Sequence, residues 1–168
     1  PGNRFAAVKI YVNDRNGHLT EIECDSMNRP VRARRFTGAC VAGVAVTAGG
    51  NRPGAPLRPG DPPLFETLMD WNADSLCTKL TEPRGNTLEW LHEVDLRAAG
   101  SVPARQKARL LVFRQRAETP CVYDQDEIVT RFVHDERFGA GRGVCFPTQI
   151  IDERGYATQC AYDTKANL

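Results

Sequence analysis

The sequence predicts an all-β domain, mainly antiparallel: a β-sandwich or partly closed β-barrel of about eight to ten strands, with one or two short helices and stabilising disulfide bonds. Alternating apolar and polar residues recur along most of the 168-residue chain, turn residues separate the alternating runs, and six cysteines are spread through it. The hydrophobic content of 41% with 26% charged residues is that of a globular protein. One domain over residues 1–168 is therefore expected.

A β-hairpin is predicted over residues 8–24, where two alternating runs flank a turn. A three-residue loop at 15–17, with its glycine in the left-handed conformation, places Val8 opposite Cys24. In this register the aliphatic residues of both strands share one face and the charged residues share the other. The first element is therefore a two-sided hairpin with one apolar face.

Further strands are expected at residues 31–36 and 40–47, which follow a turn. The basic run at 32–35 resembles the sites cut by secretory processing proteases. Because strand-like sequence follows it directly, a strand end or loop with solvated arginines is the favoured interpretation.

Residues 48–63 contain five prolines and four glycines, a composition that supports neither a strand nor a helix. A segment of this kind is a surface loop, a linker between two subdomains or a binding element. Its candidate binding residues are Pro53, Pro56 and Pro59.

Helical spacing occurs only after this loop. Phe65, Leu68 and Met69 recur at intervals of three and four residues, so one or two short helices are predicted at residues 64–71 and 74–80. Period two returns afterwards, and the remaining strands are expected at residues 88–96, 108–114, 122–123, 128–133 and 144–151.

The last predicted hairpin, residues 150–160, repeats the turn pattern of the first. Segments 14–21 and 152–159 share Asp, Gly and Thr at the same spacing, with an aromatic ring after each glycine. Common turn chemistry explains most of this likeness, because Asp accepts bonds from nearby backbone amides and Gly supplies a positive φ. Duplication of a half-domain is the alternative.

The six cysteines form no Cys-x-x-Cys pair and have no histidine close by, so zinc-ligand spacing is missing and no metal or cofactor is expected. Three disulfide bonds in an oxidising, extracellular compartment are predicted, and six free thiols in a cytosolic protein are the alternative. Local geometry favours one pairing: Cys24 with Cys40, Cys77 with Cys121, and Cys145 with Cys160.

Charge and hydropathy restrict the partners. The formal net charge of +1 lacks the basic excess of a nucleic-acid-binding protein, so no DNA partner is expected. No apolar run is long enough to span a bilayer. The chain starts without Met or an apolar leader, which we interpret as the mature or trimmed form of a secreted protein.

Two histidines are the candidates for catalysis. Period two places His92 on one face with Trp90, where a buried imidazole is either a catalytic group or a core residue with one hydrogen bond. His134 stands close to Glu136 and Arg137, groups that secreted ribonucleases combine to move a proton and stabilise a phosphorane. Adjacent strand residues point to opposite faces, so a solvated turn is the favoured interpretation of this cluster.

Five cations lie on one predicted strand and its approach: Arg105, Lys107, Arg109, Arg114 and Arg116. One interpretation is an anion-binding strip, with Arg109, Arg114 and Arg116 as its binding residues. The other is cross-strand ion pairing with Glu89, Glu93 and Asp95, and charge matching between neighbouring strands favours it.

We expect a small, secreted, disulfide-stabilised interaction protein that binds a protein partner, such as a host molecule, without catalysis. In size, composition and cysteine number the chain resembles the small secreted effectors and toxins of microbes. The first alternative is a secreted ribonuclease or glycan hydrolase that uses His92 or His134 with carboxylates. The second is a lectin-like carbohydrate binder that stacks sugars on Trp71 or Tyr156.

Overall fold

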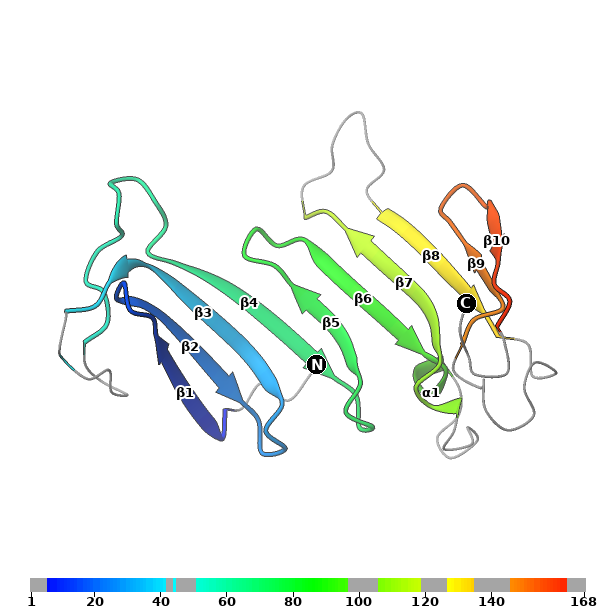
Figure 1. Ribbon diagram of the computed structural model, residues 1–168, viewed down its shortest axis with the longest axis horizontal. Helices are drawn as coiled ribbons and strands as arrows, with labels where there is room; N and C mark the ends of the chain where they lie inside the picture. The colour runs from blue at the N-terminus through cyan, green and yellow to red at the C-terminus, as the bar shows by residue number, and fades with distance from the viewer. Residues whose placement is uncertain are drawn as a thin grey trace. The chain divides into compact units, whose positions relative to one another are not determined.

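The computed structural model describes residues 6–41, 44, 51–96, 106–118, 127–134 and 146–162. Within these residues the protein has ten β-strands and one short helix, α1, at Glu93–Leu96 (Figure 1). The strands are β1 Val8–Asn13, β2 His18–Cys24, β3 Pro30–Ala39, β4 Leu64–Trp71, β5 Cys77–Thr81, β6 Thr87–His92, β7 Leu110–Arg116, β8 Glu127–Val133, β9 Gln149–Ile151 and β10 Ala157–Gln159.

The strands follow one another in chain order from β1 to β10. The strand pairs whose register is defined run antiparallel, which confirms the prediction of an all-β, mainly antiparallel protein. The chain divides into two compact units. Residues 1–71 with 80–84 form the first, which holds β1–β4, and residues 72–79 with 85–168 form the second, which holds β6–β10.

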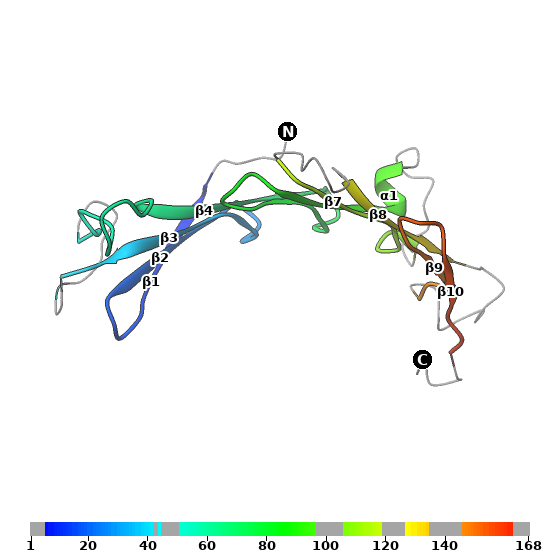
Figure 2. The same cartoon turned by 90° about the horizontal axis from the view of Figure 1, so that it is seen from above.

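Within each unit the described strands form one layer of sheet. The view in Figure 2 shows this for β1–β4 of the first unit. A sandwich needs a second sheet about 10 Å away, and a barrel needs its first and last strands to meet. The described strands of neither unit show such an arrangement, so the predicted β-sandwich or partly closed barrel is not supported. Alternation reveals that a strand has an apolar face, but it does not reveal what covers that face.

The β1–β2 hairpin of the first unit has the predicted register, with Val8 opposite Cys24. Strands β3 and β4 continue the alternation, so the sheet has two chemically different sides. The side we call the apolar face carries Val8, Ile10, Val12, Ile22, Ala33 and Phe65. The side we call the charged face carries Lys9, Glu21, Glu23, Arg32, Arg34 and Glu66.

The charged face is the more buried of the two. Glu21 and Glu23 keep only 1% and 6% of their surface exposed, whereas Val8, Ile10 and Val12 keep 43%, 44% and 50%. Antiparallel sheets usually bury the apolar side and expose the polar one. In the described part of this unit the order is reversed, and the aliphatic residues of β1 form an open surface.

The sheet of the second unit shows the same separation of side chains. Trp90 of β6 lies opposite Phe113 of β7, with ring centroids 5.5 Å apart. Glu89 lies opposite Arg114 on the other side. Strands β8, β9 and β10 extend this sheet beyond β7. The aromatic pair therefore lies on a sheet of five described strands that belong to its own unit.

Residues 64–71 and 74–80, predicted as short helices, contain strands β4 and β5 instead. β4 pairs with β3 through five consecutive partners, from Leu64 opposite Phe36 to Leu68 opposite Arg32. A continuous ladder of backbone hydrogen bonds outweighs the weak local preference that the helical spacing indicated. The helix prediction for this segment is therefore wrong.

Helix α1 lies inside the strand predicted at residues 88–96. The Asp95 carboxylate accepts the backbone N–H of His92 at 3.0 Å, and Glu93 donates its own N–H to the carbonyl of Arg109 at 2.9 Å. These bonds turn the chain at the end of β6. The alternation of the sequence continues past the turn and gave no sign of it.

Four cysteines lie in the described residues, and none of them forms a disulfide bond there: Cys24, Cys40, Cys77 and Cys160. The predicted stabilisation by disulfide bonds is therefore not supported. The predicted bond between Cys24 and Cys40 is therefore wrong. Cys40 donates its N–H to Gly17 at one end of β2, and Cys24 lies at the other end. Strand β2 separates them by about 20 Å, far beyond disulfide reach. Cys121 and Cys145 lie outside the described residues.

One five-residue turn recurs in the structure. The Asp14 carboxylate accepts the N–H groups of Asn16 and His18 at 2.8 and 2.9 Å, and Gly17 donates to the Asp14 carbonyl. Asp152 makes the same bonds with the residues that follow it. So do Asp25 and Asn72. The likeness of the first and last hairpins is therefore explained by a turn type that also occurs elsewhere in the chain, as the turn-chemistry interpretation expected.

The fourth residue of each turn has a positive φ. It is a glycine in two cases, Gly17 and Gly155, with φ of 84° in both. It is Asn28 or Ser75 in the others, with φ of 59° and 61°. The sequence analysis expected a turn before residue 31 without identifying its geometry, and it did not identify the turn at Ser75, because it linked this turn to glycine.

Replacing Gly155 with alanine should lower the free energy of unfolding by about 1–2 kcal/mol, because a Cβ is strained at positive φ. An added Cβ there meets no other atom within 4 Å, so backbone strain is the whole effect. Gly54 is equally open but lacks a positive φ, and Gly54→Ala is the matched control. Urea unfolding should show no loss for the control. Equal losses in both variants would contradict the shared turn geometry.

Candidate binding site

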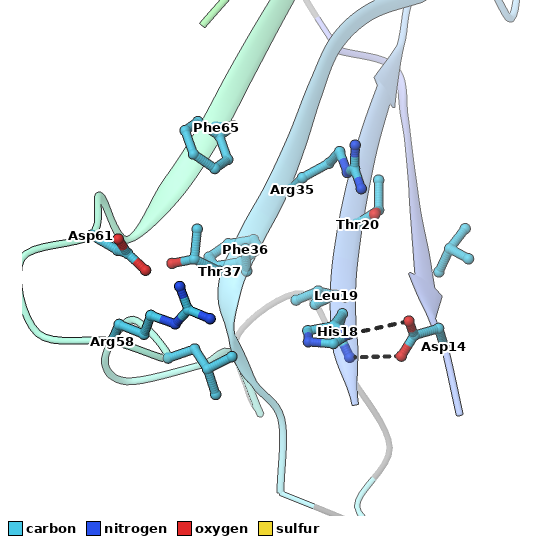
Figure 3. A pocket seen from close by; sticks show the side chains of 12 residues that line it. Asp14, His18, Leu19, Thr20, Arg35, Phe36, Thr37, Arg58, Asp61 and Phe65 are labelled. Carbon is cyan, nitrogen blue, oxygen red and sulfur yellow. Dashed lines mark hydrogen bonds and ion pairs between the residues drawn. The ribbon is translucent and has the colours of Figure 1, made fainter. Parts of the chain in front are cut away.

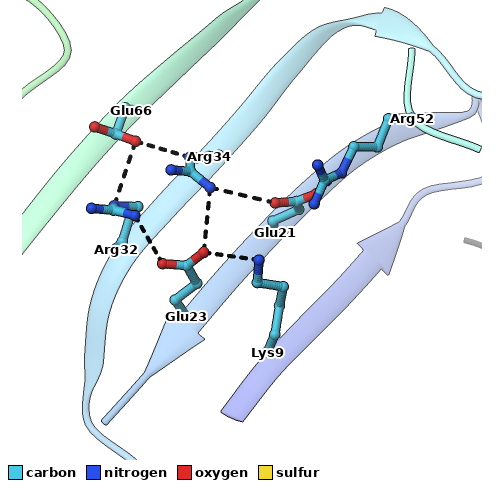
Figure 4. Close-up of polar contacts among 7 residues, drawn as sticks. All are labelled: Lys9, Glu21, Glu23, Arg32, Arg34, Arg52 and Glu66. Carbon is cyan, nitrogen blue, oxygen red and sulfur yellow. Dashed lines mark hydrogen bonds and ion pairs between the residues drawn. The ribbon is translucent and has the colours of Figure 1, made fainter. Parts of the chain in front are cut away.

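The charged face of the first unit is a network of ion pairs across four strands (Figure 4). Glu23 lies 3.0 Å from Lys9, 3.1 Å from Arg32 and 3.3 Å from Arg34. Glu66 joins the same two arginines at 3.5 and 2.9 Å. Burial raises the pKa of Glu23, but the hydrogen bond and charge of Lys9 and the charges of both arginines outweigh it, so the pKa is lowered.

This network bears on two sequence predictions. The basic run at 32–35 lies in the interior of β3, whereas the favoured interpretation expected a strand end or loop with solvated arginines. Its first two arginines, Arg32 and Arg34, form ion pairs with carboxylates, and Arg35 points to the opposite side of the sheet. The cations of the charged face are therefore matched within the protein.

The described part of the proline-rich loop packs against strands β2 and β3 of its own unit. Arg52 forms an ion pair with the buried Glu21, and the Asn51 side chain accepts the N–H of Val41 at 2.9 Å. A Cβ added to Gly38 would lie 2.9 Å from the Pro53 ring and closer still to a loop carbonyl. The described part of the loop is therefore a packed surface element. Of the predicted binding residues, Pro53 and Pro56 are half-buried and Pro59 is exposed.

Each of the two candidate catalytic histidines, which lie in the second unit, has its ring within hydrogen-bond distance of a protein oxygen. The His92 ring lies 3.3 Å from Asp95, whose other oxygen accepts a bond from Asn72. His134 Nε2 lies 2.9 Å from the Leu110 carbonyl, to which it donates. Glu136 and Arg137, predicted to act with His134, lie outside the described residues. His92 lies opposite Leu110 in the β6–β7 ladder, so the two histidines flank the same residue of β7, and each ring has a contact of its own.

The predicted anion-binding strip is matched by carboxylates. The buried Arg109 lies 3.4 Å from Glu93, and Arg114 lies 2.6 Å from Glu127 and 3.5 Å from Glu89. Ion pairs with Glu89 and Glu93 are those that the favoured interpretation, cross-strand ion pairing, expected.

Glu127 also binds the last arginine of the predicted strip, Arg116, at 2.9 Å. The hydrogen bond between them raises the pKa of Arg116 and lowers that of Glu127. Lys107 pairs with Asp74. Arg105 lies outside the described residues. The described cations of the strip therefore have their counter-charges within the second unit.

A cavity of about 470 Å³ opens on the apolar face of the first unit. One residue from each strand contributes to its floor: Val12, Thr20, Arg35 and Phe65, which share this face. The loop before β4 adds Leu57, Arg58 and Asp61, and the ends of β1–β3 add Asp14, His18, Leu19, Phe36 and Thr37. Figure 3 shows Arg58 reaching from the loop toward β3, and Arg35 lying near Thr20.

Two cations of the cavity have no carboxylate within ion-pair distance among the described residues: Arg35 and Arg58. The cavity carboxylate nearest the hairpin turn is already engaged. Asp14 accepts the His18 N–H, which lowers its pKa, and its second oxygen lies 3.2 Å from the His18 ring. The other cavity carboxylate, Asp61, is exposed.

The chemistry of the cavity suits an amphipathic anion. A guanidinium binds a carboxylate through two parallel hydrogen bonds, and Arg35 and Arg58 can offer such forks. Val12, Phe36, Leu57 and Phe65 supply apolar walls. The site can therefore hold a carboxylate together with an apolar group attached to it.

The sequence analysis did not single out Arg35 or Arg58. A signal for Arg35 was present in the run at 32–35, because period two places it on the aliphatic side while Arg32 and Arg34 face the other way. Arg58 had no such signal, since its position over the sheet depends on the path of an irregular loop.

The comparisons with known proteins give no relative: no protein-family model and no curated protein matches the chain. In the described residues, no group of three His, Cys, Asp or Glu side chains is placed to hold a metal ion. None of the helices in that part of the chain is long and apolar enough to cross a membrane.

Acid should weaken the fold. The pKa values of Asp14, Glu23, Asp25 and Glu127 are lowered in the folded protein, so on acidification the unfolded chain takes up protons first. These carboxylates contribute stability above their unfolded pKa values of about 4, and the contribution is lost as pH falls through the lower folded values. The urea midpoint should drop between pH 6 and pH 3.

Asp25→Asn should reduce this drop, because the buried Asp25 is held ionised by Arg29 at 2.7 Å and asparagine does not titrate. The matched control is Asp61→Asn, an exposed carboxylate outside the ion pairs of the described residues. The control should keep the wild-type pH dependence. A drop for Asp25→Asn as large as that of the wild type would contradict the role of this pair.

Proposed function

We propose that the protein is a non-catalytic interaction protein whose first unit binds an extended polypeptide on its apolar face. Arg35 and Arg58 bind a carboxylate of that polypeptide in the cavity. One observation carries the proposal: a cavity on an open apolar sheet face contains two arginines without a described carboxylate partner.

The exposure of the apolar face supports this function. Val8, Ile10 and Val12 follow one another along β1, and Phe65 on β4 is also exposed. Stable monomers rarely leave contiguous apolar surface of this kind uncovered, and such surfaces mark interaction sites. Val12 and Phe65 also line the cavity, so the open face and the cavity form one continuous surface.

The shape of the surface favours a polypeptide. The aliphatic residues of β1 follow one another at a repeat of about 6.6 Å, which matches the spacing of same-side side chains on an extended chain. A carboxylate at the end of such a segment, or on one of its side chains, then reaches the arginines. The partner is therefore an extended segment with apolar residues at alternate positions and one carboxylate.

The two alternatives from the sequence have weaker support. A hydrolase would use His92 or His134, whose rings contact Asp95 and a backbone carbonyl. A carbohydrate binder would use Trp71, whose indole donates to the Pro30 carbonyl at 2.7 Å, or Tyr156, which is 72% exposed. Tyr156 alone keeps a surface suited to stacking.

The secreted, effector-like setting and the host partner stay predictions from the sequence. The four described cysteines form no disulfide bond, which removes part of the support that cysteine number gave to this setting. The interaction class does not depend on that setting, because it rests on the exposed face and the cavity of the first unit.

Binding can be measured by fluorescence anisotropy with labelled six-residue peptides that alternate valine and serine, made with either a free C-terminal carboxylate or a C-terminal amide. The acid should bind the wild-type protein about tenfold more tightly than the amide, because a charge-assisted pair contributes about 1.5–3 kcal/mol. Arg35→Ala and Arg58→Ala should each remove most of this preference.

Arg84→Ala is the matched control, since Arg84 is an exposed turn arginine of the same unit outside the cavity. It should bind like the wild type. Equal binding of acid and amide would contradict the carboxylate site. Binding unchanged by Val12→Asp would contradict the use of the apolar face, and no binding of either peptide would contradict the proposed function.

A further inference from the structure

Strand β1 is the first strand of the sheet order, and in the described residues its ladder partner is β2. A strand at the end of a sheet presents unpaired N–H and C=O groups along its outer side. One hydrogen bond of the hairpin turn identifies the residues of β1 that present these unpaired groups. In this bond Asp14 donates its N–H to the His18 carbonyl at 3.1 Å.

That bond shows which alternate residues of β1 direct their backbone N–H and C=O groups toward β2. Asp14 and His18 continue the register in which Val12 lies opposite Thr20, so Asp14 and every second residue before it direct their backbone groups toward β2. The residues between them direct theirs away from β2: Lys9, Tyr11 and Asn13. The outer edge of β1 therefore offers three backbone N–H and three C=O groups to a further strand.

The edge has little of the usual protection against pairing. Residues 8–13 contain no proline or glycine and combine valine, isoleucine and tyrosine, which favour strands. The single charge, Lys9, is held 3.0 Å from Glu23 over the charged face. A charge bound in this way repels an incoming strand less than a free lysine would.

We propose that two copies of this chain associate through β1, antiparallel and with the two-fold axis at Tyr11. In this arrangement Tyr11 pairs with Tyr11 of the second copy, and Lys9 pairs with Asn13. The three outward residues of each copy all find backbone partners. The contact is isologous, so it closes as a dimer and leaves no further edge at this strand.

Charge and the extent of strand β1 select this register. An axis at Ile10 would place Asn13 opposite Ala7, whose N–H is already bonded to the Cys24 carbonyl, and an axis at Val12 would place Lys9 opposite Arg15 of the turn. A two-fold axis at Lys9 would place two ammonium groups opposite each other, and an axis at Asn13 would leave Lys9 without a partner residue. The axis at Tyr11 avoids both. It also places Ile10 opposite Val12 of the second copy, so exposed aliphatic side chains of the two apolar faces contact each other across the junction.

The proposal does not depend on peptide binding in the cavity, because its hydrogen bonds come from the backbone of Lys9, Tyr11 and Asn13, which lie outside the cavity lining. Val12 contributes a side chain to both surfaces. Its test measures the association of the protein with itself. Sedimentation equilibrium of the full chain should show a mass that rises from one copy toward two with concentration.

Cross-linking tests the register. Paired residues on antiparallel strands with mutual hydrogen bonds have Cα atoms about 5.5 Å apart, within the range for a disulfide. Tyr11→Cys should therefore give a covalent dimer on mild oxidation that is absent from wild-type protein with its native thiols. Lys9→Cys mixed with Asn13→Cys should also cross-link, whereas each of these two variants by itself should not.

Tyr11→Pro tests the edge itself. Proline removes an N–H that points outward, and edge strands tolerate it, so the β1–β2 pairing is kept and the dimer is lost. Circular dichroism checks that the Tyr11→Pro variant is folded. If it is not folded, cross-linking of the cysteine variants tests the dimer instead. The proposal is overturned if the wild-type protein stays monomeric at all concentrations. It is also overturned if the protein dimerises but Tyr11→Cys gives no cross-link, or if a folded Tyr11→Pro variant still dimerises. Binding of an unrelated strand peptide at β1 by a monomeric protein would also overturn it.

Discussion

The register of the β1–β2 hairpin determines which chemistry each side of the first unit presents. The turn at Asp14 sets that register through the bonds it accepts and through the positive φ of Gly17. A slip by one residue would exchange the two faces, because side chains alternate with period two. Glu21 and Glu23 would then face the side of Val12, away from Arg32 and Arg34 of β3. The ion-pair network, the apolar face and the cavity all depend on this one alignment.

The ion-pair network explains why a sheet can bury its charged side. Each carboxylate of the charged face lies within ion-pair distance of an arginine or a lysine, so desolvation of the charge is offset by partners on neighbouring strands and on the loop. Arg52 extends this to the loop and closes over Glu21. The charged side is thereby covered by its own ion pairs and by Arg52, and the aliphatic residues of β1 are left exposed.

The same turn is used at four strand ends with different residues at its positive-φ position. Gly17 and Gly155 follow the preference for glycine, while Asn28 and Ser75 adopt the conformation because the surrounding bonds hold it. The shared feature is the side-chain oxygen at the first position, which accepts two amides. Sequence reasoning recognised the shared pattern only in the two glycine turns, although it also expected a turn before residue 31. The Asp or Asn at the first position is the signal that all four turns share.

The sequence by itself determined the antiparallel all-β class, the pairing of Val8 with Cys24 and the two-sided character of the hairpin, because alternation and turn chemistry are local. Tertiary structure decided what local patterns do not contain. Pairing with β3 made residues 64–71 a strand, and the length of β3 put Cys24 and Cys40 at opposite ends of β2. The cavity belongs to the same category: Arg35 and Arg58 are 23 positions apart in the chain, and only the path of the loop brings them to one surface. Contacts between distant segments depend on how strands pair and loops return, and alternation along a strand carries no record of either.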